Sequence, residues 1–260
     1  TPIEQNIKVY YTNLVLGGID FAIIEDRKFK SGPKGKIPQQ GPRPDHINNP
    51  DYDPKTIDVE GLKLLGQRQL DFLGSWGENN SEMKAVLSQT GFCGGAHLHG
   101  DKQNRLHADM DSNGWPQTGR NKALKIIKKA NAVHVGGDQH IATVIHHGID
   151  SYEDGPWAFV VPAIVNNYYS RWWWPENEQI GVNGNENLPW TGRYLDGFNN
   201  KITMHAYANP DTNSNGAGYG VVRFNKDVKT VTFECWPRHE DVSKKNASQF
   251  KGWPITISLN

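Results

Sequence analysis

The pattern of predicted strands and helices changes near the middle of the chain, and this change constrains the fold most. Strands alternate with amphipathic helices up to about residue 137, as in α/β proteins. Beyond it, strands follow one another across Gly, Asn and Asp turns without helices, which is typical of antiparallel hairpins. The early strands are predicted at 7–12, 19–25, 84–88 and 132–136, and the helices at 60–76 and 118–130. The later strands are predicted at 141–147, 157–161, 201–207, 219–224 and 230–236. We therefore expect an α/β part over residues 1–150 and a mainly antiparallel β part over residues 151–260.

Composition excludes several classes of protein. Lys and Arg total 28 and so do Asp and Glu, so the net charge of zero does not suggest a nucleic-acid-binding surface. No apolar run reaches the roughly 18–20 residues that a membrane-spanning helix needs.

The chain opens with Thr1-Pro2 instead of a Met or a signal-like segment, so we expect a processed chain or part of a longer protein. Cys93 and Cys235 can form one disulfide or remain two buried thiols.

The segment Gly136-Gly137-Asp138-Gln139-His140 is the sharpest local feature, because it directly follows a strand predicted to be buried. Glycines allow a sharp turn there, and ligand sites of α/β sheets lie at such strand ends. Asp138 offers a carboxylate oxygen and His140 an imidazole nitrogen, a pair that suits one metal cluster. The alternative is a structural turn in which Asp138 caps the next segment and His140 packs.

Two predicted long loops, 30–55 and 89–117, carry further candidates. In the second loop, His97 and His99 have a spacing that suits metal ligands, although loop histidines are more often solvated. Asp111 precedes the helix at 118–130, where it can bind a ligand, cap the helix or pair with Arg120. In the first loop, Asp45, Asp51 and Asp53 lack the spacing of a calcium loop and are expected to be solvated.

Other polar and aromatic features are open to two interpretations. Arg27 follows the strand at 19–25, where its guanidinium can bind phosphate or pair with an acidic neighbour. Trp172, Trp173 and Trp174 can stack on a sugar or base, or pack a loop against the sheet. The serine-hydrolase elbow, the Walker loop, the dinucleotide fingerprint and the His-Glu-x-x-His zinc motif do not occur in the sequence.

The order of several short blocks resembles the PhoD-like alkaline phosphatase and phosphodiesterase family of calcineurin-like metallophosphoesterases. These blocks are scattered over nearly the whole chain, and their order is more specific than any one of them. They are Phe21–Arg27, Leu64–Leu73, Val86–Gln89, Asp111–Pro116 with Arg120, Gly137–His140, Ala208–Pro210 and Gly218–Gly220.

The resemblance implies a layered α/β fold with two sheets and helices, and a centre of two metal ions, iron and calcium. It implies that Asp138 and His140 are metal ligands, with His97 as a further ligand, and that Arg27 and Asp111 are catalytic residues. It also implies phosphate ester substrates and an exported protein, periplasmic or extracellular.

The sequence departs from the family pattern upstream of the strand at 19–25. The Asp- and His-containing metal motifs that precede this strand in the superfamily do not occur here. We therefore expect residues 1–260 to be the C-terminal portion of a single metallophosphoesterase domain, with the N-terminal metal-binding portion missing. A companion segment or chain would then supply that portion. The alternative function is a non-catalytic β-rich binding module that uses its Trp-rich loops for carbohydrate or protein contact.

Overall fold

The computed structural model describes most of the 260 residues. The described ranges are 2–4, 7–8, 10–95, 98–99, 105–164, 171–173, 175, 184–208 and 216–259. Within these ranges, no helix has both the length and the apolar character required to cross a membrane.

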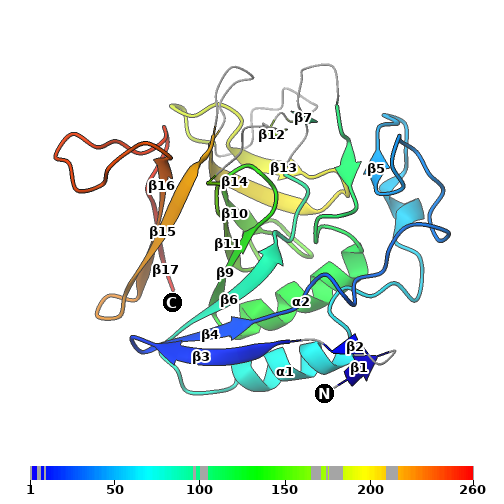
Figure 1. Ribbon diagram of the computed structural model, residues 1–260, viewed down its shortest axis with the longest axis horizontal. Coiled ribbons are helices and arrows are strands. Elements are labelled where there is room, and N and C mark those ends of the chain that lie inside the picture. The colour runs from blue at the N-terminus through cyan, green and yellow to red at the C-terminus, as the bar shows by residue number, and fades with distance from the viewer. Residues whose placement is uncertain are drawn as a thin grey trace.

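The centre of the fold is an eight-stranded mixed sheet (Figure 1). Its strand order is β13-β14-β10-β11-β9-β6-β4-β3. The strands are β3 (Thr12–Leu16), β4 (Ile19–Ile23), β6 (Met83–Thr90), β9 (Ala132–Gly137), β10 (Thr143–His147), β11 (Trp157–Val160), β13 (Gly192–Leu195) and β14 (Lys201–Tyr207). The strands β4, β6, β9 and β11 run parallel, and the strands outside this group pair antiparallel. One sheet thus combines a parallel centre, to which β11 of the second half also belongs, with antiparallel strands on both sides.

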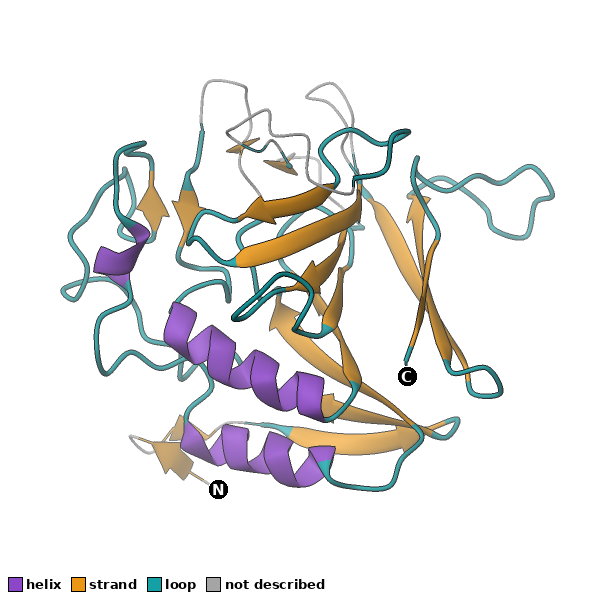
Figure 2. Ribbon diagram, turned by 180° about the vertical axis from the view of Figure 1, so that it is seen from behind, coloured by secondary structure: helices purple, strands orange, loops and turns teal. Residues whose placement is uncertain are grey.

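Helices α1 (Gln67–Gly77) and α2 (Gln117–Lys129) lie side by side over one face of this sheet (Figure 2). Because successive strand residues point to opposite faces, each parallel strand contributes to two cores. In β6, Val86 packs with the buried residues of the helices, whereas Ala85 packs in the core on the other face. Both side chains are fully buried, which explains why two successive residues of this strand are apolar.

A separate antiparallel sheet covers the opposite face. It consists of β15 (Gly218–Asn225), β16 (Thr230–Pro237) and β17 (Ile255–Ser258). Phe233 of β16 packs with Phe159 of β11, with ring centroids 5.4 Å apart. The predicted fold class is therefore confirmed: the chain forms a layered α/β structure with two main sheets.

Most predicted elements agree with the structure to within a few residues, but the helix predicted at 60–76 is wrong in its first part. Helix α1 begins only at Gln67. Gly61 and Gly66 have φ of 84° and 75°, a left-handed conformation that interrupts a right-handed helix. Leu62 and Leu65, which the periodicity placed on the helix, therefore lie in the loop before it. The strand predicted at 7–12 corresponds instead to β2 (Ile7–Lys8) and the start of β3.

The two predicted long loops are tied together by a small core and a short sheet. Strands β5 (His46–Ile47) and β8 (Ala108–Asp109) pair antiparallel, one from each loop. Beneath them, apolar side chains from both loops, including Ile47 and Trp115, are buried together with Phe198. The remaining short elements are β1 (Pro2–Glu4), which pairs with β2, β7 (Leu98–His99), which pairs with β12 (Arg171–Trp172), and the 3-10 helix Pro54–Ile57.

The structure answers two questions that the sequence left open. Cys93 and Cys235 are both free, buried thiols, so no disulfide joins them. Trp173 is fully buried and donates its indole N–H to the carbonyl oxygen of Trp190 at 2.8 Å. Its ring contacts Tyr194 edge-on at 5.3 Å, so this Trp packs a loop and is closed to a stacking ligand. The side chain of Trp172 and the whole of Trp174 lie outside the described residues.

Candidate active site

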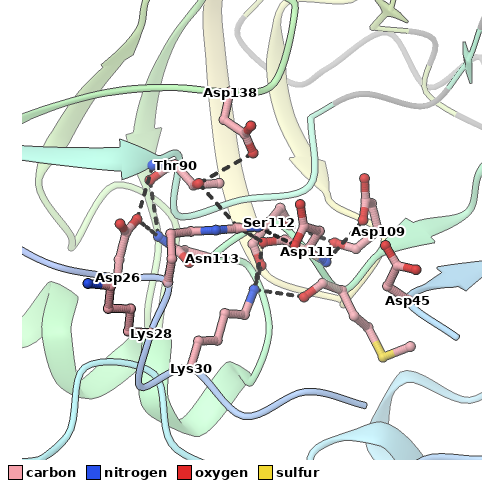
Figure 3. A network of polar contacts seen from close by, with 12 residues as sticks. Asp26, Lys28, Lys30, Asp45, Thr90, Asp109, Asp111, Ser112, Asn113 and Asp138 are labelled. Atoms are coloured by element: carbon pink, nitrogen blue, oxygen red, sulfur yellow. Dashed lines mark hydrogen bonds and ion pairs between the residues drawn. The ribbon is translucent and has the colours of Figure 1, made fainter. Parts of the chain in front are cut away.

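The carboxyl ends of β4, β6 and β9 meet at one edge of the central sheet, and polar residues follow each of them (Figure 3). Asp26 and Arg27 follow β4, Thr90 ends β6, and Asp138 follows β9. The loop between β8 and α2 adds Asp111 to the same group. Neighbouring parallel strands place their carboxyl ends side by side, which is why these residues converge.

Asp26 is the buried anchor of this group. Its carboxylate accepts hydrogen bonds from the backbone N–H of Thr90 at 3.0 Å and of Gln89 at 3.3 Å, and from the side-chain amide of Asn113. Burial raises the pKa of Asp26, although these hydrogen bonds act in the opposite direction. The side chain is fully buried, so it fixes the end of β6 and the loop of Asn113 and is closed to substrate.

Arg27 and Asp111 form an ion pair across the site. One guanidinium nitrogen donates to the backbone carbonyl oxygen of Asp111 at 2.8 Å, and another contacts its carboxylate. Burial alone would lower the pKa of Arg27, but the charge of Asp111, aided by Asp138, raises it. The structure therefore brings the two predicted catalytic residues together. The alternative pairing of Asp111 with Arg120 does not occur, because Arg120 is buried and donates to the carbonyl oxygens of Phe92 and Gly148.

Asp138 joins this group through Thr90, whose hydroxyl donates to the Asp138 carboxylate at 3.3 Å. The same hydroxyl accepts a longer hydrogen bond of 3.4 Å from Arg27. Asp138 is exposed, so its carboxylate is open to a ligand. Asp138 and His140 have φ of 67° and 54°, a conformation that is uncommon outside Gly and is often found at functional sites. Between them, Gln139 is buried.

His140 and His97 are the other two predicted metal ligands. His140 is half-buried and follows Asp138 by two residues, as the motif requires. His97 lies outside the described residues, so its predicted role stays a prediction.

Lys30 binds the backbone of the segment that carries Asp111. Its ammonium donates to the backbone carbonyl oxygens of Met110, Asp111 and Ser112 at 2.6–2.7 Å. It also lies over the ring of Trp115, 5.7 Å from the centroid. Burial lowers the pKa of Lys30 to about 7. This lysine holds the loop that presents Asp111.

A second group of potential metal ligands adjoins the first. Asp45, His46 and Asp109 each offer one ligand atom, and these atoms lie within 4.8 Å of one another. The expectation that Asp45 is solvated is therefore wrong, because the side chain is half-buried against His46 and pairs with Arg43. Asp51 and Asp53 are exposed, as predicted.

Comparison with known proteins identifies the fold. No protein-family model matches this sequence, and no curated protein matches it in a sequence search. A solved structure entitled "Structure of PhoD" is similar to the chain, with a TM-score of 0.58 and 14% sequence identity. The chain has a PhoD-like α/β fold. The similarity covers 100% of this chain but 44% of that PhoD chain, so the present chain spans less than half of its length.

Sequence reasoning missed several residues of this candidate site. Lys30 lies in a loop and has no motif around it. Asp26 stands beside Arg27 in the sequence, but this position alone does not indicate that it anchors the site. Thr90 and Asn113 gave no signal of their own, because their roles depend on contacts between distant segments. Asp45-His46 and Asp109 were all visible as metal-ligand types, but only the pairing of β5 with β8 shows that they are neighbours.

Proposed function

We propose that this chain is a metal-dependent phosphoric ester hydrolase of the PhoD-like type. The observation that carries this proposal is the convergence of Arg27 and Asp138, at the carboxyl ends of parallel strands in a PhoD-like fold, with Asp111 from a loop. Carboxylates that are open to solvent at such an edge suit metal ions, and a nearby guanidinium suits a phosphoryl group.

The proposed roles follow from the donor types. Asp138 and His140 hold metal, with His97 as a further ligand, and iron and calcium are the proposed ions. Such a centre supplies an activated water and neutralises charge on the phosphoryl oxygens. Arg27 and Asp111 are the proposed catalytic pair. Because Asp111 holds the guanidinium from one side, Arg27 presents its charge in a fixed direction, which is the form of preorganisation that stabilises a developing negative charge.

The charge of the carboxylates supports a role for metal at this site. Asp26, Asp111 and Asp138 surround Arg27, and their charge would repel a phosphate ester. A metal ion held by Asp138, whose carboxylate is open to solvent, would reverse the local charge and make the site attractive to such a substrate. Asp138 is the most exposed of the three and is therefore the first that a substrate or ion meets.

We further propose that the active enzyme contains more chain than these 260 residues. The PhoD chain that it resembles is more than twice as long as the aligned part, and a companion N-terminal segment would add metal ligands. By the same resemblance, we propose that the protein is exported.

The proposal is tested by assaying hydrolysis of p-nitrophenyl phosphate and bis(p-nitrophenyl) phosphate after addition of iron and calcium. We expect Asp138→Asn and His140→Gln to reduce the rate by at least about tenfold to a hundredfold, since even outer-shell changes at metal sites cost this much. Asp227→Asn is the matched control, because it makes the same chemical change at an exposed turn.

Activity that survives both substitutions would refute the metal roles of Asp138 and His140. If the chain hydrolyses neither ester, alone or with an N-terminal segment supplied, the alternative of a non-catalytic binding module is favoured.

A further inference from the structure

Asp45, His46 and Asp109 form a cluster whose chemistry the proposed catalytic groups do not use. Their potential ligand atoms all lie within 4.8 Å of one another, and the His46 Nε2 atom is 3.8 Å from the Asp45 carboxylate. One imidazole and two carboxylates are a mixed nitrogen and oxygen set, which sets the cluster apart from an ordinary group of surface acids. Such a set suits Zn²⁺, which accepts imidazole and carboxylate ligands, and also Mn²⁺, which favours carboxylate oxygens.

The backbone holds these three residues in place. His46 of β5 lies opposite Asp109 of β8 in the antiparallel pair. The N–H of Met110 donates to the carbonyl oxygen of Asp45 at 2.8 Å, and the N–H of His107 donates to that of Ile47 at 2.8 Å. The ligand atoms are therefore brought together by main-chain pairing between two distant loops, so little further ordering is needed to bind an ion.

Burial adds an independent argument. The exposed fraction of His46 is 8% and that of Asp109 is 5%, so both donors are largely withdrawn from water. Burying a carboxylate is costly unless its charge is compensated. Asp45 is partly compensated by Arg43, and Asp109 accepts a hydrogen bond from the N–H of Asp111. A divalent cation bound between the two carboxylates would add compensation to both charges.

Arg43 competes with a metal ion for the Asp45 carboxylate. Its guanidinium binds the Asp45 carboxylate through two hydrogen bonds of 3.1 and 2.6 Å. The Arg43 side chain is 60% exposed, so it approaches Asp45 from the solvent side and can turn away. An ion in the cluster would lie close to this cation, so Arg43 weakens the binding that the three ligands favour.

We propose that Asp45, His46 and Asp109 form a binding site for a divalent transition-metal ion, separate from Asp138 and His140. The ion fastens the loop that contains Asp45 to the segment that contains Asp109. Asp109 in turn accepts a hydrogen bond of 3.0 Å from the N–H of Asp111, the partner of Arg27. The site would therefore hold the segment that carries Asp111, whichever reaction the protein performs.

The experiment is calorimetric titration of the chelator-treated 260-residue chain with Zn²⁺ and, separately, Mn²⁺. His46→Gln and Asp109→Asn each remove one ligand, and we expect either to weaken binding of one equivalent by more than tenfold. The double variant Asp138→Asn/His140→Gln should retain that equivalent, which separates this site from the proposed catalytic one. His239→Gln, at an exposed imidazole, is the matched control.

Arg43→Gln distinguishes a metal site from a simple ion pair. We expect this variant to bind the ion more tightly, because a competing cation has been removed. If a variant at one of the buried residues fails to fold, Asp45→Asn provides the test instead, because Asp45 is only half-buried. Circular dichroism reports whether each variant is folded. The proposal is overturned if neither ion binds, or if folded variants at Asp45, His46 and Asp109 bind it as the unmodified chain does.

Discussion

Two buried histidines should make the stability of this protein fall steeply below neutral pH. His134 is fully buried beside Phe92, and its Nε2 atom lies 2.6 Å from the hydroxyl oxygen of Ser88. Because Ser88 donates its one hydroxyl hydrogen to the carbonyl oxygen of Thr90, His134 must donate to Ser88. Its Nδ1 atom is then the only place for a second proton, and it has no hydrogen-bond partner among the described residues.

His147 has a comparable restriction. Its Nδ1 atom accepts a hydrogen bond from Arg120 at 3.2 Å, so a second proton would have to enter facing a permanent cation. Burial lowers the pKa of His134 to about 3, and burial together with the charge of Arg120 lowers the pKa of His147 well below its usual value. Both imidazoles are therefore neutral in the folded protein at mildly acid pH.

The sign of the pH effect follows from proton uptake. Between the unfolded pKa of about 6.5 and the lower folded value, the unfolded chain binds more protons, so the free energy of unfolding falls as pH falls. Each histidine contributes a slope of about 1.4 kcal/mol per pH unit, or about 2 kcal/mol between pH 6.5 and pH 5. Together they cost about 4 kcal/mol, a large part of the roughly 5–15 kcal/mol that stabilises a typical domain.

The assay is urea unfolding followed by Trp fluorescence at pH 7, 6 and 5. His134→Gln keeps a donor for Ser88 and removes the titrating ring, so we expect its slope to be smaller by about 1.4 kcal/mol per pH unit. His239→Gln measures the effect of losing an exposed imidazole. An unchanged slope in His134→Gln would refute the assignment of this effect to His134.

Further predictions concern the thiols, the site loop and the sheet edge. Cys93 and Cys235 should not react with a thiol reagent at pH 8 until the protein is unfolded, because burial raises the pKa of both, that of Cys93 to about 12. Lys30→Met should lower the free energy of unfolding, measured by urea titration, by about 2 kcal/mol, because it removes a charged donor from three backbone carbonyl groups. An unchanged free energy would show that other contacts hold the loop of Asp111. Val15→Lys should reduce self-association as measured by light scattering, because β3 is an edge strand with the exposed apolar residues Val15 and Leu16. Unchanged scattering would mean that this edge does not associate.

Much of the architecture could be predicted from local patterns. The helix α2 and the strands β9, β14 and β16 lie within a residue of their predicted spans, because their periodicity and flanking turns are local signals. The failure at α1 has a local cause too. The apolar spacing of Leu62 and Leu65 imitates a helix, but the left-handed Gly61 and Gly66 prevent one from forming.

The pairing of strands was less predictable. β11 was expected among antiparallel hairpins, but it pairs parallel to β9 on one side and antiparallel to β10 on the other. Its continuous apolar run is compatible with a parallel or an antiparallel partner. Which strands flank β11 depends on contacts between distant segments, such as the packing of Phe159 with Phe233, and no local pattern records them.

The sequence by itself determined the position of Asp138 and His140 at the end of a buried strand, since a strand, two glycines and a motif are encoded within about ten residues. It also determined that Arg27 follows a strand, the one at 19–25. The tertiary structure alone decided that Arg27 pairs with Asp111 and not with an adjacent acid, and that Asp45, His46 and Asp109 meet. These contacts join loops that are far apart in the chain. Their formation depends on the closure of those loops over a shared apolar core, and no local pattern records which loops will close together.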